Sequence, residues 1–256
     1  MKQQSNDIKA FAARSPFLFA LVFFVVSLCL SLVDAFVLPP LWGDQVVQSV
    51  LSIGVLAWLG WLCLVGFNGP SRWHSLHLLW LPGLLALFYL SLFLLTMHVS
   101  GAMVVVLAAL LALLNGLSEE ARFRGVVLQA LLPYGWLRAA ALSALFFGLL
   151  HLANLLVSPP LITLGYVVGA FLFGFGYAAC RLRTNTIWPL IIFHACGDFF
   201  YPIFTDLNGG TGPAIVSNSL FVVAQIIFWL LLAGYGLFLL RPRRQPGPHL
   251  ETLEGQ

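Results

Sequence analysis

The amino-acid sequence predicts an all-α membrane protein: one bundle of about eight transmembrane helices, with the N- and C-termini in the cytoplasm. The chain has 256 residues, of which 61% are hydrophobic and only 8% charged, and its mean hydropathy is +0.97. A soluble domain carries roughly 25% charged residues. Apolar runs recur along the whole chain, and several reach the about 20 residues that a helix needs to cross a bilayer. These observations exclude a soluble globular protein.

Each predicted span is an apolar run bounded by polar, charged or proline-containing residues. The fourth run is too long for one straight crossing, so we expect it to tilt, break or continue along the inner interface. Residues 16–240 form one predicted membrane domain, between a cytoplasmic N-terminal segment, 1–15, and a basic tail, 241–256, that is expected to be disordered. The predicted spans are Pro16–Leu38, Val46–Phe67, Leu76–His98, Met103–Pro133, Leu137–Val157, Leu161–Cys180, Thr186–Phe204 and Pro213–Leu240.

Basic residues set the predicted orientation, because lysine and arginine accumulate in cytoplasmic segments. With a cytoplasmic N-terminus, ten of the twelve basic residues fall in inner segments, and the outer loops at 39–45, 99–102, 158–160 and 205–212 hold none. The net charge of +3 therefore reflects topology and contact with the lipid bilayer, and no nucleic acid is expected as a partner. The predicted location is the plasma (inner) membrane, and the compact chain with short loops favours a bacterial source.

Cysteines and glycines within the spans indicate packing. Gly165 and Gly169 form a G-x-x-x-G pattern on the sixth span, which predicts close contact with a neighbouring helix. The cysteines lie inside spans without metal-ligand spacing, so a disulfide framework is not expected. They are Cys29, Cys63, Cys180 and Cys196.

Four charged side chains interrupt the fourth apolar run, in the segment SEEARFRG. An ionised side chain near the bilayer centre costs about 2.5–3.5 kcal/mol on insertion scales, so these charges must face the protein interior and pair. Glu120 and Arg124 are four residues apart, in the favourable order for a helical ion pair. Glu119 points about 100° away from Glu120, toward something else. The alternative is that the charges only mark the inner end of the span, with Arg122 reaching the interface.

Two later spans also carry ionisable residues. His151 follows Phe147 by four residues in the fifth span, and His194 precedes Asp198 by four in the seventh. At a rise of about 1.5 Å per residue, both histidines and Glu119 lie roughly 15–20 Å from the inner ends of their spans. Ionisable residues that converge on one level inside the membrane indicate a functional site.

A carboxylate beside two imidazoles suits the activation of water. Glutamate can accept a proton from water, and histidine can hold the water, donate to a developing oxyanion or bind a metal. Hydrolysis of a peptide bond in a water-filled cavity is the best chemical fit. The residues alone leave proton translocation almost equally open.

The three patterns resemble the three motifs of the CAAX protease and bacteriocin-processing family, the glutamic-type intramembrane endopeptidases related to CAAX prenyl endopeptidases. The segment EEARFRGVVLQALL is especially similar to the first motif, and the resemblance covers about residues 101–205. It implies an eight-span intramembrane endopeptidase whose site opens toward the cytoplasm and whose substrate is a membrane-anchored protein or peptide. The patterns are Glu119-Glu120-x-x-x-Arg124, Phe147-x-x-x-His151 and His194-x-x-x-Asp198.

The resemblance also implies a role for each residue. Glu119 resembles the glutamate that activates the attacking water, and His151 resembles its partner in positioning that water. His194 and Asp198 match positions that stabilise the oxyanion. The supporting residues it implies are Glu120, Arg124 and Phe147.

Asp198 departs from the prenyl endopeptidases, which have asparagine at this position. An ionised aspartate cannot donate to an oxyanion, so Asp198 must be protonated, orient His194 or bind a metal. No cofactor is expected, and the alternative is a zinc-dependent protease with His151, His194 and Asp198 as ligands. A non-catalytic immunity or partner-binding protein of the same fold and a proton-coupled transporter also stay open.

Overall fold

The computed structural model describes residues 10–37, 43–67, 73–96, 101–156, 158–199 and 219–241. Every regular element in these residues is helical, so the predicted all-α class is confirmed. A short helix over residues 10–14 comes first. The elements that follow are α2 (Pro16–Val37), α3 (Gly43–Leu59), η1 (Trp73–Leu79), α4 (Trp80–Thr96), α5 (Ala102–Glu120), η2 (Ala121–Val127), α6 (Leu128–Leu131), η3 (Leu132–Tyr134), α7 (Trp136–Leu150), η4 (His151–Leu156), α8 (Pro160–Thr184), α9 (Trp188–Asp198) and α11 (Ser219–Leu240).

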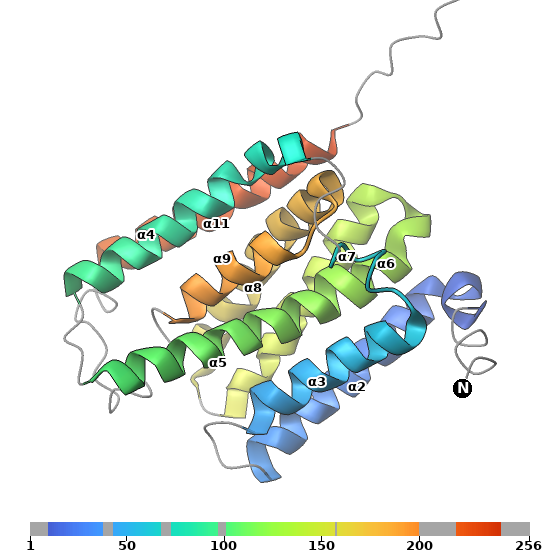
Figure 1. The fold of residues 1–256 in the computed structure, drawn as a ribbon, viewed down its shortest axis with the longest axis horizontal. Helices are drawn as coiled ribbons and strands as arrows, with labels where there is room; N and C mark the ends of the chain where they lie inside the picture. Colours follow the sequence, from blue (N-terminus) through green and yellow to red (C-terminus); the bar gives the residue numbers. More distant parts are fainter. Residues whose placement is uncertain are drawn as a thin grey trace, which may run out of the picture.

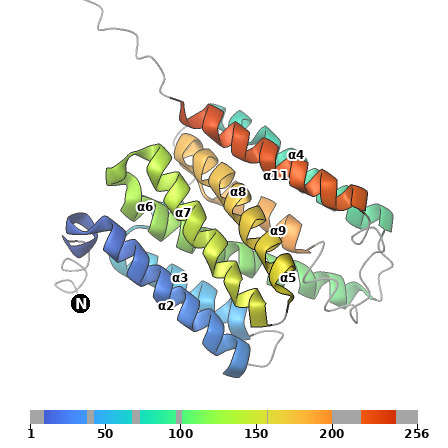
Figure 2. The same ribbon diagram turned by 180° about the vertical axis from the view of Figure 1, so that it is seen from behind.

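The helices form two layers. One layer runs α3, α5, α9, α4 and faces the viewer in Figure 1. The other runs α2, α7, α8, α11 and faces the viewer in Figure 2. The motif-bearing helices α5, α7 and α9 therefore lie in the middle of the bundle, covered by α2 and α3 on one edge and by α4 and α11 on the other.

Within the described residues, five helical segments are long and apolar enough to cross a membrane: Pro16–Val33, Ala102–Tyr134, Trp136–Leu156, Pro160–Thr184 and Phe221–Leu240. The surface matches a lipid environment, since large apolar side chains such as Leu94, Met103 and Leu161 are 72%, 77% and 81% exposed. The chain is a multi-pass membrane protein.

Three predicted spans were wrong in extent. The sixth continues four residues beyond Cys180, because α8 runs to Thr184. The second ends as a helix at Leu59 and not at Phe67, because Gly60 takes a positive φ of 67° and starts a series of turns. The seventh begins at Trp188 and not at Thr186, and its predicted end, 200–204, lies outside the described residues. The described 11 residues of α9 measure about 16 Å at 1.5 Å per residue.

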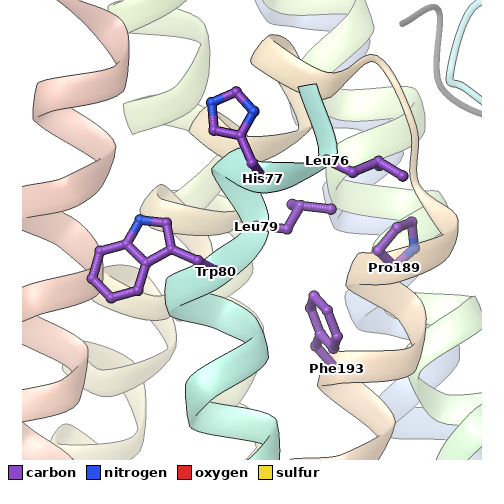
Figure 3. A pocket seen from close by; sticks show the side chains of 6 residues that line it. All are labelled: Leu76, His77, Leu79, Trp80, Pro189 and Phe193. Carbon is purple, nitrogen blue, oxygen red and sulfur yellow. The ribbon is translucent and has the colours of Figure 1, made fainter. Parts of the chain in front are cut away.

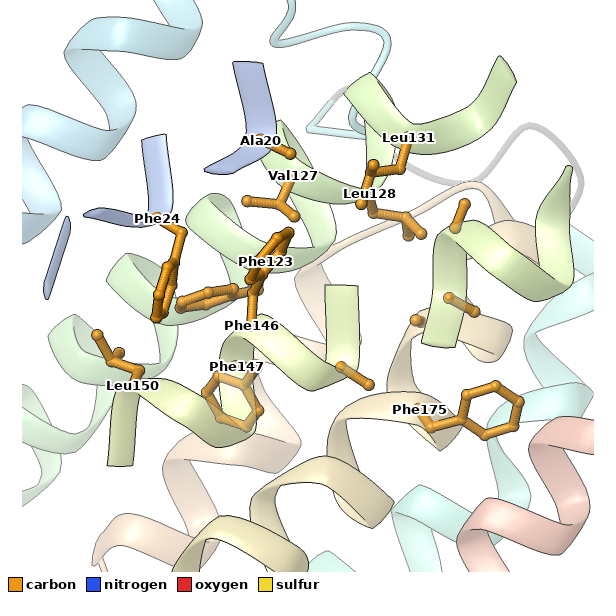
Figure 4. Close-up of a cluster of buried hydrophobic side chains, with 14 residues drawn as sticks. Ala20, Phe24, Phe123, Val127, Leu128, Leu131, Phe146, Phe147, Leu150 and Phe175 are labelled. Carbon is orange, nitrogen blue, oxygen red and sulfur yellow. The ribbon is translucent and has the colours of Figure 1, made fainter. Parts of the chain in front are cut away.

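The fourth predicted span, which is too long for one straight crossing, forms one long helix whose geometry changes along its length. It continues without a break from Ala102 to Tyr134, but its helical type changes from α to π over Ala121–Val127 and ends in a 3₁₀ turn. A hydrophobic cluster packs around this change of geometry (Figure 4), with Phe123, Phe146 and Phe147 at its centre and Phe24 of α2 stacked on Phe146.

The described arginines outside the fourth span gather at one end of the bundle, called here the arginine end. Arg181 donates from Nε to Val65 O at 2.9 Å, and Arg183 lies 5.0 Å over the Trp136 ring and donates to Leu239 O, so the ends of four elements meet there. The start of α7, the ends of α8 and α11 and the short helix before α2 lie at this end of the bundle (Figure 1). These segments carry all the described arginines apart from Arg122 and Arg124, namely Arg14, Arg138, Arg181, Arg183 and Arg241.

Candidate active site

The first motif lies where α5 gives way to the π-helix η2. Glu119 and Glu120 are the last residues of α5, and all seven residues of η2 are buried. A π-helical turn inside an α-helix is rare and occurs mostly at functional sites. Counting about 1.5 Å per residue, Glu119 lies roughly 20–25 Å from either end of the Ala102–Tyr134 segment, close to the middle of the bundle.

The predicted ion pair between Glu120 and Arg124 is present. Arg124 Nε lies 3.2 Å from Glu120 Oε2, and the two side chains are 1% and 0% exposed. The N–H bonds of Arg124 are not aligned with a hydrogen-bond acceptor among the described residues. The guanidinium instead lies 4.2 Å over the Phe147 ring. Attraction to a carboxylate and to an aromatic face thus stabilises this buried cation together.

His194 brings both glutamates to one imidazole. Its Nδ1 lies 2.7 Å from Glu120 Oε1, and its Nε2 lies 3.4 Å from Glu119 Oε2. A carboxylate can only accept, so Nδ1 carries the hydrogen of the shorter contact. The prediction that Glu119 and Glu120 point in different directions is consistent with their contacts at different nitrogens of His194. That both contact the same imidazole of α9 does not follow from the sequence of α5.

Asp198 joins the same cluster through an amide that the sequence motifs did not include. Asn115 Nδ2 donates to Asp198 Oδ2 at 2.8 Å, and the same oxygen lies 3.6 Å from His194 Nε2. In the sequence, Asn115 is marked only by its spacing: it lies four residues before Glu119 and therefore on the same face of the helix. The Glu119 and Asp198 side chains are 13% and 20% exposed, against 8% for His194, so they are the members that water reaches most easily.

His151 is a neighbour of this cluster and not a direct contact. It opens η4, with Nδ1 3.0 Å from Phe147 O and its ring 5.1 Å from the Phe147 ring. Phe147 in turn lies 6.0 Å from the His194 ring, so the phenyl group stands next to both histidines. Among the described residues, no carboxylate lies within ion-pair distance of His151. If Nδ1 donates to the carbonyl, Nε2 is the nitrogen that can accept from a water molecule.

The zinc alternative required His151, His194 and Asp198 to converge. Within the described part of the chain, no group of three histidine, cysteine, aspartate or glutamate side chains is arranged to hold a metal ion. His194 Nδ1 is already engaged by Glu120, which leaves one ring nitrogen as a possible ligand. The residues named for zinc therefore do not form a ligand set in this arrangement.

An open, apolar hollow of about 320 Å³ lies between α4 and α9 (Figure 3). It contains none of the candidate site side chains, although Phe193 directly precedes His194. The chemistry therefore belongs to the buried polar cluster and not to this hollow. Its lining consists of Leu76, His77, Leu79, Trp80, Pro189 and Phe193.

Residues 101–200 match the family described as type II CAAX prenyl endopeptidase Rce1-like. The matched segment contains the whole cluster, from Asn115 to Asp198. Over these residues, 100 of the 256 in the chain, the protein is similar to the CAAX protease family. No curated protein and no solved structure matches it. The match supports, at the level of the family, a CAAX-type intramembrane protease.

The close approach of α5 to α9 depends on Gly116. A Cβ at this position would lie 2.8 Å from Ile191 O and 3.5 Å from His194 Cβ. The backbone oxygen cannot move aside as a flexible side chain could. The position next to the catalytic candidates therefore requires a glycine.

We expect Gly116→Ala to lower the free energy of unfolding by about 1–3 kcal/mol, the usual effect of overpacking. The measurement is denaturation of the purified protein in mixed micelles. Gly165→Ala is the matched control, because a Cβ there meets nothing within 4 Å. Equal stability of the two variants would contradict the close contact. The close contact predicted for the G-x-x-x-G pattern is therefore wrong at Gly165 and present at Gly169, where a Cβ would lie 2.5 Å from the Trp229 ring.

Proposed function

We propose that this protein hydrolyses a peptide bond of a membrane-anchored protein or peptide, using a water molecule activated by Glu119. The observation that carries the proposal is the position of the His194 ring. Its Nδ1 contacts Glu120, and its Nε2 lies within ion-pair distance of Glu119 and Asp198. One accessible carboxylate and one oriented imidazole meet at mid-depth of a membrane protein. The family match over residues 101–200 supports the same reaction class.

In the proposed reaction, Glu119 accepts a proton from water while the water oxygen attacks the scissile carbonyl carbon. His194, held by Glu120 and protonated on both ring nitrogens, donates from Nε2 to the oxyanion that develops on the carbonyl oxygen. The C–N bond then breaks, and the proton on Glu119 passes to the leaving amine. His151 holds the water through Nε2 before the attack. Arg124 neutralises Glu120, so Glu120 orients His194 without acting as a second base.

Asp198 acts in this scheme as the residue that orients His194. Asn115 donates to Asp198, which makes the contacted oxygen an acceptor and argues against a proton on that atom. The mechanism uses no metal, because Glu119 and two histidines suffice to hold and activate water. The zinc-dependent version remains the alternative that experiment must exclude.

We expect Asp198→Asn to keep activity within about tenfold of the wild type, well short of the about 10²–10⁴-fold loss that removing a proton-transfer group causes. An amide oxygen can still accept from Asn115, as the carboxylate does. If a protonated Asp198 were required, wild-type activity would fall as the pH rises while the amide variant stayed active. The measurement is the rate against pH, with and without a chelator. An inactive variant, with wild-type activity lost to the chelator and restored by zinc, would establish the zinc-dependent version.

The arginine end supports a cytoplasmic N-terminus. We propose, as the family resemblance implies, that the site opens to the cytoplasm, and we place the protein in a bacterial inner membrane. We expect a membrane-impermeant maleimide to label Ser158→Cys in intact cells, and to label Arg138→Cys only after permeabilisation. Both variants are made in a background whose native cysteines are replaced by alanine. The reverse labelling pattern would contradict the orientation.

The activity itself is tested with the full chain reconstituted in lipid vesicles. The probes are a proteome-derived peptide library, S-farnesylated peptides with a C-terminal CAAX sequence, and their unprenylated counterparts. Mass spectrometry is expected to find new peptide termini with the wild type and none with His194→Ala or His151→Ala. The two CAAX arms separate a prenyl-dependent from a prenyl-independent enzyme. Absence of wild-type cleavage in all three probe sets, from protein that unfolds cooperatively, would contradict the proposed function.

A further inference from the structure

We propose that Phe173 and Tyr177 of α8 are positioning residues that fix the His194 ring from a helix with none of the three motifs. The inference rests on the proposed function. It adds a fourth helix to a site otherwise built from α5, α7 and α9. Neither residue touches the carboxylates, so both act through His194 and Arg124.

Three aromatic rings surround the His194 imidazole. Its ring centroid lies 5.1 Å from Phe173, 6.0 Å from Phe147 and 6.3 Å from Tyr177. The interplanar angles are 69°, 86° and 89°, so all three contacts are edge-to-face, the geometry that aromatic pairs prefer. The hydrogen bond at Nδ1 and the ion-pair contacts at Nε2 define the ring axis but allow the ring to tilt about it. The three rings restrict that tilt, and with it the direction of the Nε2 hydrogen.

The same three rings surround Arg124. Its guanidinium carbon lies 4.2 Å from the Phe147 centroid, 5.8 Å from Tyr177 and 5.9 Å from Phe173. Nη1 and Nη2 are buried and have no hydrogen-bond partner among the described residues. Ring faces therefore take the place of hydrogen bonds around a desolvated cation. A displaced ring on α8 therefore shifts the His194 imidazole in two ways. It changes the direct ring contact, and it moves Arg124, which pairs with Glu120, the residue that binds His194 Nδ1.

Gly174 lets α8 come this close. A Cβ at this position would lie 3.0 Å from Phe147 Cδ1 and 3.3 Å from Arg124 Nη2. The glycine stands between Phe173 and Tyr177 in the sequence, and their two rings contact each other at 4.0 Å. The backbone thus approaches Arg124 directly, beside the paired rings of Phe173 and Tyr177.

Phe175 provides a matched control on the same helix. It is a buried phenylalanine, 6% exposed, but its ring packs against Gly236 of α11 and lies well apart from Phe147 in Figure 4. Phe173→Leu and Phe175→Leu therefore remove the same atoms from two sides of one helix. Only the first removes a contact with His194.

The experiment measures kcat and KM on the best-cleaved library peptide, together with the thermal midpoint of each variant. We expect Phe173→Leu and Tyr177→Leu to lower kcat by about 10–100-fold with KM within about twofold, as a small misplacement of a catalytic group does. Tyr177→Phe keeps the ring and should keep kcat. Phe175→Leu should lower the thermal midpoint by a similar amount while kcat changes by less than about threefold.

Equal kcat values for Phe173→Leu and Phe175→Leu, or loss of kcat in Tyr177→Phe, would overturn the proposal. If Phe173→Leu fails to fold, Phe173→Met, which fills more of the volume, replaces it. Inactive wild-type protein would refute the proposed function. Active wild-type protein with an unaffected Phe173→Leu variant would refute only the positioning role.

Discussion

Replacing Glu119 by glutamine is expected to lower kcat by about 10³-fold or more, because an amide cannot accept the proton of the attacking water. Glutamine has the same shape as glutamate. The contact that loses its charge, between Glu119 Oε2 and His194 Nε2, is long at 3.4 Å, so its loss should cost little stability. The variant should therefore insert in the membrane and unfold at the wild-type temperature. The measurement is single-turnover cleavage of the best library peptide by protein in vesicles, which separates the chemical step from product release.

Asp198→Asn is the matched control for Glu119→Gln, since both change a carboxylate to an amide beside His194 Nε2. The control is expected to stay within about tenfold of the wild type, so the contrast between the variants isolates proton transfer from the loss of charge. If Glu119→Gln retained more than about a tenth of the wild-type rate, Glu119 would not be the base.

Removing either partner of the Glu120–Arg124 pair is expected to destabilise the protein by about 3–5 kcal/mol, because the other charge is left buried without its partner. Both side chains are at most 1% exposed, so water cannot replace the missing charge. Arg124→Met and Glu120→Leu are the two single variants. The measurement is the free energy of unfolding in detergent mixtures of increasing denaturing strength.

The double variant, Glu120→Leu with Arg124→Met, separates the charge from the packing. Apolar side chains that replace both members of a buried pair often restore stability, so the double variant should be more stable than either single one. It should still be inactive, because His194 Nδ1 loses its acceptor. A double variant that is active, or less stable than both single variants, would contradict the role assigned to the pair.

Properties of short segments could be predicted from the sequence. The first predicted span, Pro16–Leu38, agrees with α2 to within one residue at its end, because the transfer of an apolar run into lipid depends on that run alone. The Glu120–Arg124 ion pair also follows from local helix geometry. The family resemblance was placed on residues 101–205 and the family match covers 101–200.

The ends of the shorter helices were harder to predict, for a local and a tertiary reason. The turn after Leu59 follows from the positive φ of Gly60, which a hydropathy profile does not register. The turns of residues 60–67 are then held by contacts with the other end of the chain, such as the hydrogen bond from Arg181 Nε to Val65 O across 116 positions. An apolar run shows that a segment can be buried, but not whether it stays helical.

The sequence by itself determined the helical class, the approximate spans, and the residue types that meet at the site. The tertiary structure decided which atoms meet. His194 and Glu120 are 74 positions apart, and Asn115 and Asp198 are 83 apart. Each helix presents its face independently of its neighbours, so only the packing of α5 against α9, permitted by Gly116, brings both glutamates to one imidazole. The rings of α8 carry no motif, and their place beside His194 depends on how the two layers of the bundle pack.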